Sequence, residues 1–176
     1  MNEELQRISQ RMLSEGDKTI AYFKNLPREA WEAQVYTTGT CWNIKQVLAH
    51  FLSAERGLNA LVHDIITEGG GAPEEFDIDE FNESEVADLA NLEIPALLDA
   101  FGKARKEFSD LVGSLSAQDL DRMGRHPWFG ETELRKALKL VYRHNMIHLR
   151  DIRKALATGQ PAPHLDFTPP AQEGQG

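Results

Sequence analysis

Apolar residues recur at helical spacing along most of the chain, and no stretch alternates between apolar and polar residues long enough to predict a sheet. The pattern predicts four long amphipathic helices. They are expected over residues 3–25, from Asn43 to the glycines at 69–71, over residues 94–115, and from Thr132 to Gly159. Four helices of this kind are the ingredients of a four-helix bundle, so the predicted fold class is all-α.

The second long helix has a clear predicted start. Asn43 with Gln46 three residues later forms a capping box, and Trp42 before the cap can pack on Val47. This cap fixes the helical phase of the residues that follow. It places His50 on the flank of the apolar stripe.

Other local patterns predict the connections and the end of the domain. Asn82 and Glu85 resemble a second capping box, which predicts a short helix ahead of the third long one. Residues 122–131, "RMGRHPWFGE", are expected to form a loop. Residues 159–176 hold four of the eight prolines and little that is apolar. We therefore expect one domain over residues 1–158, followed by an extended tail over residues 159–176.

Composition narrows the classes of partner. The formal net charge is -9, with 28 acidic residues spread along the chain, which disfavours binding to nucleic acid or to an anionic membrane. The first residues are charged, and no run approaches the roughly 20 apolar residues that a membrane span needs. The single cysteine, Cys41, excludes an internal disulfide framework and fits a reducing compartment. We expect a cytoplasmic protein.

The segment "YRHNMIHLRDIRKAL" places His144 and His148 one helical turn apart. Four residues rotate the side-chain direction by only about 40°, so the two imidazoles share nearly one face, close to the apolar stripe. One buried histidine is usually a core residue with a single hydrogen-bond partner. Two stacked imidazoles would repel each other if both were protonated, whereas a shared divalent cation satisfies both acceptor nitrogens.

A third ligand should come from another helix at a comparable depth, and His50 is the candidate. Three histidines around one cation leave a coordination position open for water or a substrate thiolate, as in catalytic metal sites. The polar residues that could support the ring nitrogens from outside are Asn43, Asn145 and Asp151. The other histidines are expected elsewhere: His63 on another surface, His126 solvated in a loop and His164 solvated in the tail.

Other chemistries are poorly represented in the sequence. Cys41 lies just ahead of a helix, where the pKa of a thiol can fall, but it is expected to be a packed small residue. There is no glycine-rich phosphate loop, no His-Glu-x-x-His motif and no Glu-x-x-His pair of the di-iron type. No residue can be named as a general base.

Three segments in order carry a family resemblance: "CWNIKQVLAHFLSAERGL", "DEFNESEVADL" and "FGETELRKALKLVYRHNMIHLRDIRKAL". Together they resemble the DinB-like superfamily of metal-binding four-helix bundles of the DinB and YfiT type, over nearly all of residues 1–158. The matching positions are Trp42 ahead of the second helix, His50 within it, and the pair His144 and His148 on the fourth helix.

This resemblance implies an up-down-down-up bundle and a divalent metal, zinc or nickel first, with manganese or iron as alternatives. It implies a small-molecule substrate and, as the first expectation, transfer or isomerisation with a low-molecular-weight thiol such as bacillithiol or mycothiol. Hydrolysis by a metal-bound water is the alternative. Two alternatives stay open. The chain could be a non-catalytic stress or scaffold protein with a structural or empty histidine site, or a cofactor-free module that binds an apolar ligand. A homodimer is expected under either the enzyme or the scaffold hypothesis.

Overall fold

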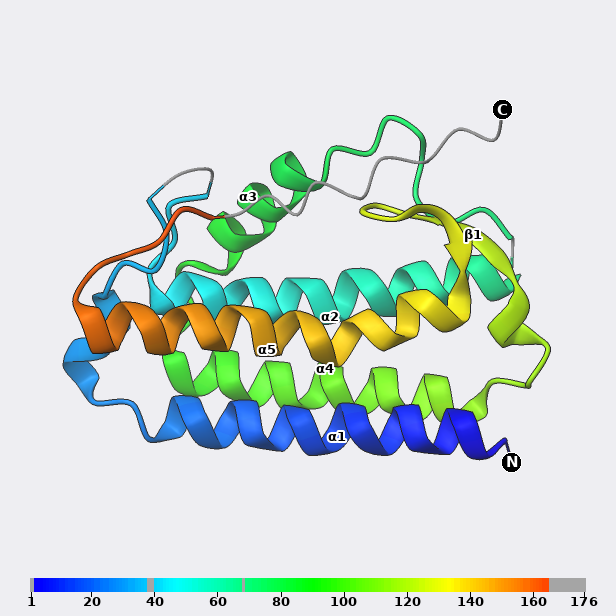
Figure 1. The fold of residues 1–176 in the computed structure, drawn as a ribbon, viewed down its shortest axis with the longest axis horizontal. Coiled ribbons are helices and arrows are strands. Elements are labelled where there is room, and N and C mark those ends of the chain that lie inside the picture. The colour runs from blue at the N-terminus through cyan, green and yellow to red at the C-terminus, as the bar shows by residue number, and fades with distance from the viewer. Residues whose placement is uncertain (1, 38–39, 68, 165–176) are drawn as a thin grey trace.

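The computed structural model describes residues 2–37, 40–67 and 69–164, and four long helices dominate them (Figure 1). These helices are α1 (Glu3–Lys24), α2 (Ile44–Thr67), α4 (Ile94–Ser114) and α5 (Leu134–Thr158). Helices α1 and α5 run in one direction and α2 and α4 in the other, which confirms the up-down-down-up bundle. Around the bundle, α4 packs between α1 and α2, and α5 packs on α1 and α2. None of the helices in the described part of the chain is long and apolar enough to cross a membrane.

A crossing connection joins α2 to α4, because these neighbours run in parallel. It contains α3 (Ile78–Leu89), which packs on α2. The expected cap at Asn82 is wrong, since the helix already begins at Ile78. Asp77 caps it instead, and its Oδ1 accepts the backbone N–H groups of Asp79 and Glu80, both at 3.0 Å. An acidic cap also suits the partial positive charge of a helix N-terminus.

The predicted capping box at the start of α2 is confirmed. The Asn43 N–H donates to Gln46 Oε1, and the Gln46 N–H donates to Asn43 Oδ1, both at 2.9 Å. Trp42 and Val47 lie buried in the same hydrophobic cluster. Ahead of this cap, a short 3-10 helix (η1, Arg28–Glu32) and the strand-like segment around Tyr36 close one end of the bundle.

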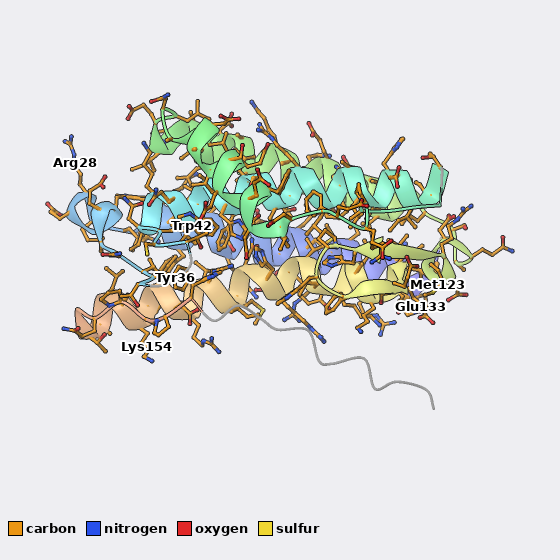
Figure 2. All side chains as sticks on the ribbon, turned by 90° about the horizontal axis from the view of Figure 1, so that it is seen from above. Arg28, Tyr36, Trp42, Met123, Glu133 and Lys154 are labelled. Atoms are coloured by element: carbon orange, nitrogen blue, oxygen red, sulfur yellow. The ribbon has the colours of Figure 1, made fainter. Side chains whose placement is uncertain are left out.

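Residues 122–131 do not form only a loop. They contribute to a hairpin of β1 (Met123–His126) and β2 (Gly130–Glu133), and α5 therefore starts at Leu134 rather than at Thr132. The hairpin depends on close backbone approaches. A Cβ on Gly124 would lie 2.5 Å from Ile65 Cγ1, and one on Gly71, at φ 85°, would lie 2.6 Å from the Arg125 carbonyl oxygen. In Figure 2 the Met123 and Glu133 end of the molecule is far from Tyr36 and Trp42.

On α5 the apolar residues that face the bundle, Leu134, Leu138, Val141 and Ile152, are buried, whereas Leu156 at the end of the same stripe is 38% exposed. On α1 the buried stripe includes Leu5, Ile8, Met12, Thr19 and Phe23.

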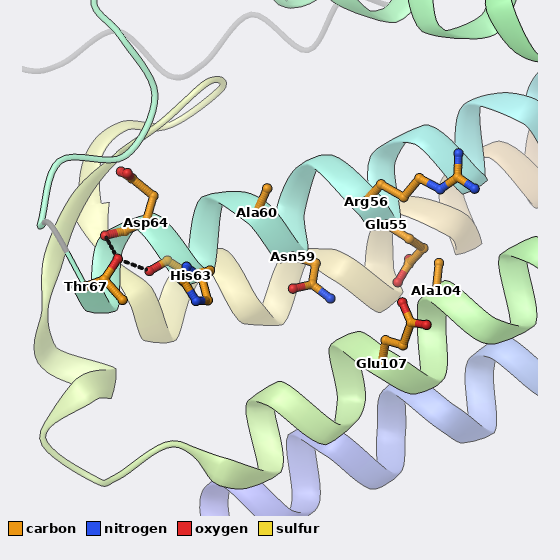
Figure 3. A pocket seen from close by; sticks show the side chains of 9 residues that line it. All are labelled: Glu55, Arg56, Asn59, Ala60, His63, Asp64, Thr67, Ala104 and Glu107. Atoms are coloured by element: carbon orange, nitrogen blue, oxygen red, sulfur yellow. Dashed lines mark hydrogen bonds between the residues drawn. The ribbon is translucent and has the colours of Figure 1, made fainter.

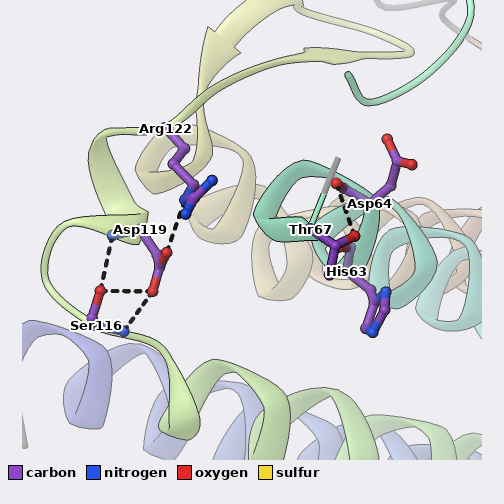
Figure 4. A network of polar contacts seen from close by, with 6 residues as sticks. All are labelled: His63, Asp64, Thr67, Ser116, Asp119 and Arg122. Atoms are coloured by element: carbon purple, nitrogen blue, oxygen red, sulfur yellow. Dashed lines mark hydrogen bonds and ion pairs between the residues drawn. The ribbon is translucent and has the colours of Figure 1, made fainter. Parts of the chain in front are cut away.

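A short 3-10 helix, η2 (Asp119–Asp121), follows α4. Asp119 Oδ2 accepts from the N–H and the Oγ–H of Ser116, and Arg122 Nε donates to Oδ1 (Figure 4).

Candidate metal centre

His50 on α2 and the pair His144 and His148 on α5 meet between two adjacent antiparallel helices. The Nε2 atom of His144 lies 3.0 Å from Nε2 of His50 and 3.1 Å from Nε2 of His148. The capping box fixes the phase of α2, and the one-turn spacing aligns the pair on α5. The structure thus brings together all three histidines that the sequence nominated.

These imidazoles are held neutral. Burial, and then the neighbouring histidines, lower the pKa of His50 and of His148 well below the ordinary value. Burial lowers the pKa of His144 to about 4, although the Asn145 amide opposes this change. Each neutral ring carries one nitrogen with a free lone pair, which is the form that binds a metal. The Nδ1 atom of His50 is buried and makes no hydrogen bond to any described residue.

The spacing of the three nitrogens suits a cation. A tetrahedral site with zinc–nitrogen bonds of about 2.0–2.1 Å has edges of roughly 3.3 Å. The candidate ligand atoms of His50, His144 and His148 all lie within 4.8 Å of one another. Within the described ranges, no other group of three histidine, cysteine, aspartate or glutamate side chains comes this close.

Tyr36 and Trp42, from the segment before α2, enclose the cluster. The Tyr36 hydroxyl lies 2.6 Å from His148 Nδ1 and donates to Asp151 Oδ2 at 3.2 Å. The Trp42 ring packs on the His50 ring, with centroids 4.6 Å apart. Burial, followed by Asp151, raises the pKa of Tyr36, so the phenol stays protonated. Both aromatic residues lie between α2 and α5 in Figure 2.

The family model for the DinB superfamily matches residues 13–152 of this sequence. The chain belongs to the DinB superfamily. Curated protein sequences gave no match. Among solved structures, the chain is similar to YfiT from Bacillus subtilis, described as "a probable metal-dependent hydrolase with an unusual four-helix bundle topology", with a TM-score of 0.72, 18% identity and 90% of each chain covered. At this identity the likeness supports the shared four-helix fold.

Two other histidines of this DinB-superfamily chain do not lie where the sequence suggested. His126 was expected to be solvated, but β1 buries it to 3% exposure, and its Nδ1 accepts the N–H of Trp128 at 3.1 Å. Burial, followed by Lys136, lowers the pKa of His126 to about 4. His164 is half-buried rather than solvated, and its ring lies 4.5 Å from the Tyr36 ring and stacks on His148 at 5.8 Å.

The remaining sequence candidates divide clearly. His63 is exposed on another surface, as expected, whereas Cys41 is exposed rather than packed. Asn43 is occupied elsewhere, because its side chain caps α2 and donates to Glu32. Asp151 is only partly exposed and contacts Tyr36.

Sequence reasoning missed Tyr36. It approaches His148 across 112 positions of the sequence, and no local pattern signals such a contact.

A separate hollow of about 560 Å³ lies between α2 and α4 and contains none of the three clustered histidines. Figure 3 shows its lining residues, among them Glu55, Asn59, His63 and Glu107. Its walls mix acidic and basic side chains, and Arg56 offsets part of the negative charge. The convergence of ligand atoms, rather than the size of a hollow, therefore marks the candidate site.

Proposed function

We propose that this chain is a metal-dependent enzyme in which His50, His144 and His148 hold a divalent cation with one position open to substrate. The observation that carries the proposal is the convergence of three neutral Nε2 atoms at 3.0 and 3.1 Å. Zinc or nickel is the first choice, because imidazole nitrogen suits both, and manganese or iron is the alternative. The described relative YfiT, a probable metal-dependent hydrolase of the same fold, supports the choice of reaction class.

Hydrolysis is the leading reaction. A bound divalent cation lowers the pKa of a coordinated water so that hydroxide is available near neutral pH. The residues of the chain supply the surroundings. Three neutral imidazoles add no negative charge to the centre, and the packed rings of Trp42 and Phe51 limit access of water to the histidines. A small-molecule substrate would reach the side of the cation that no histidine occupies.

Thiol transfer is the second candidate, and it uses the same open position. Here the sulfur of a low-molecular-weight thiol, such as bacillithiol or mycothiol, takes the place of water, and the cation stabilises the thiolate. The open position of a three-histidine set accepts sulfur as well as oxygen. The two reactions therefore differ in what occupies the open position, which is water in hydrolysis and the thiol sulfur in transfer.

Metal analysis of untagged protein and calorimetric zinc titration test the proposal. Wild type is expected to bind one zinc per chain, and His144→Ala is expected to lose this binding. His63→Ala is the matched control, because His63 is exposed outside the cluster. If wild type carries no stoichiometric metal and takes up none of zinc, nickel, manganese or iron, the proposal is wrong.

The cobalt-loaded protein separates the two reactions. If the enzyme is a thiol transferase, bacillithiol or mycothiol should add a sulfur-to-cobalt charge-transfer band. If it is a hydrolase, the visible spectrum should instead change with pH as the bound water ionises. A spectrum that responds to neither would favour a closed structural metal site, as in a scaffold protein.

A further inference from the structure

The Tyr36 hydroxyl connects the buried His148 ring to a carboxylate near the surface. Its oxygen lies 2.6 Å from His148 Nδ1 and 3.2 Å from Asp151 Oδ2. Asp151 Oδ1 in turn accepts from the Arg150 guanidinium at 3.1 Å. His148, Tyr36 and Asp151 therefore form a series of hydrogen bonds that starts at a candidate metal ligand.

The chemistry of these groups decides which one donates in each hydrogen bond. The Tyr36 hydroxyl has a single proton, and it donates that proton to Asp151 Oδ2. The Tyr36 oxygen is then an acceptor, and His148 Nδ1 must be the donor. We propose that Tyr36 and Asp151 hold His148 in the tautomer protonated on Nδ1, which leaves the Nε2 lone pair free for the cation. Tyr36 is thus a positioning residue, and this role rests on the proposed function of the three histidines.

The backbone around Tyr36 is clamped from two sides. On one side, the Val35 N–H and the Tyr36 N–H both donate to the Trp42 carbonyl, at 2.9 and 3.3 Å. On the other, the Ala162 N–H donates to the Val35 carbonyl, and the Thr37 N–H donates to the Ala162 carbonyl, both at 3.0 Å. The segment after α5 thus helps to fix the position of the Tyr36 backbone. The Tyr36 side chain itself is buried.

Such a partner has two effects on a metal ligand. It fixes the ring orientation and tautomer, and it makes the ligating nitrogen more basic, and loss of such partners typically costs 10–100-fold in metal affinity. Without the Tyr36 oxygen, the Nδ1 proton would be buried without an acceptor. The ring would then favour protonation on Nε2, which can donate to His144 Nε2 at 3.1 Å and is unable to bind a metal.

Two measurements on the full chain test this role. Long-range proton–nitrogen NMR of the metal-free protein is expected to show His148 protonated on Nδ1 in wild type and on Nε2 in Tyr36→Phe. Competition with a chelator is expected to show 10–100-fold weaker zinc binding in Tyr36→Phe. Tyr22→Phe is the control, because Tyr22 is half-buried against Phe23 and should leave both readouts unchanged.

Asp151→Asn is the second variant and perturbs the core less, because the Asp151 side chain is 21% exposed. It should weaken zinc binding in the same direction by a smaller factor, since a neutral amide oxygen still accepts the phenol proton. The proposed role of Tyr36 is wrong if wild-type His148 carries its proton on Nε2, or if Tyr36→Phe binds zinc as tightly as Tyr22→Phe. If wild type binds no metal at all, the proposed function fails. The position of the His148 proton, read by NMR, then decides alone whether Tyr36 fixes the tautomer.

Discussion

Two buried polar clusters share helix α2 but differ in how they are satisfied. Glu55 and Arg105 neutralise each other at 2.5 Å, and the Arg105 guanidinium also donates to the Met12 carbonyl at 3.2 Å. In the histidine cluster, by contrast, three nitrogens of the same kind face one another. The first cluster contains opposite charges and supports the bundle, whereas the second contains three neutral rings whose lone pairs a cation can bind.

A glycine on a neighbouring helix makes room for the Glu55–Arg105 ion pair in the bundle core. Both side chains are 2% exposed, and Gly16 of α1 makes room for Arg105. A Cβ on Gly16 would lie 2.9 Å from Arg105 Cγ. Glycine has a low helix propensity, so the position of Gly16 in the middle of α1 has a packing reason. It lets a guanidinium cross between two helices.

The largest expected effect comes from breaking this pair. Arg105→Met should destabilise the fold by about 3–5 kcal/mol, because it leaves the Glu55 carboxylate buried without a counter-charge. The measurement is urea unfolding at pH 7. Replacing both partners with apolar residues, Glu55→Leu with Arg105→Met, should recover most of the loss. A loss below about 1 kcal/mol in Arg105→Met would contradict a structural role for the pair.

The pH dependence of this variant sharpens the same point. Burial raises the pKa of Glu55 above its ordinary value, and Arg105 opposes that rise. A carboxyl whose pKa is raised by folding stabilises the fold below its unfolded pKa and loses this contribution as the pH rises through the folded pKa. The loss caused by Arg105→Met should therefore be larger at pH 8 than at pH 5.

The next largest effect separates the two clusters directly. Zinc at about 100 times its Kd should stabilise wild type by roughly 2.7 kcal/mol in the same unfolding measurement. His50→Ala should gain nothing, because it removes one of the three ligands. Arg105→Met should gain as much as wild type, although it starts from a lower stability. Equal stabilisation of wild type and His50→Ala would show that zinc binds elsewhere.

At pH 7, where the preceding effects are compared, the smallest effect concerns His126, a buried histidine outside the cluster whose contribution changes only in acid. Burial lowers its pKa to about 4 in the folded chain, against 6.5 as the ordinary value. The unfolded chain therefore takes up the proton first, and stability is lost as the pH falls from about 6.5 toward 4. His126→Asn keeps an acceptor for the Trp128 N–H and should be less acid-sensitive than wild type, by up to about 1.4 kcal/mol per pH unit. Parallel stability curves for the two proteins would contradict this.

The sequence predicted the parts of this molecule that depend on local patterns. Helical periodicity identified the four long helices, and the capping box at Asn43 set the phase of α2 correctly. That phase, together with the one-turn spacing of His144 and His148, was enough to nominate the three histidines that meet. These features each require only a few neighbouring residues.

The missed features depend on contacts between distant segments. The strands of the hairpin are short, and β1 packs closely on α2 where Gly124 fits against Ile65. The hairpin buries His126. Because residues 122–131 were predicted to be a loop, His126 was wrongly predicted to be solvated. His164 approaches the site because residue 162 pairs with Tyr36, far away in the sequence. Local patterns carry no information on such pairings.

The central claim is that the three histidines form one open metal site. A crystal structure of the zinc-loaded protein, with anomalous data at the zinc edge, tests it most directly. The expected result is a peak about 2.0–2.1 Å from Nε2 of His50, His144 and His148, with water or another non-protein ligand completing the coordination. No peak at this position, or a fourth ligand supplied by a side chain of this protein, would contradict the claim.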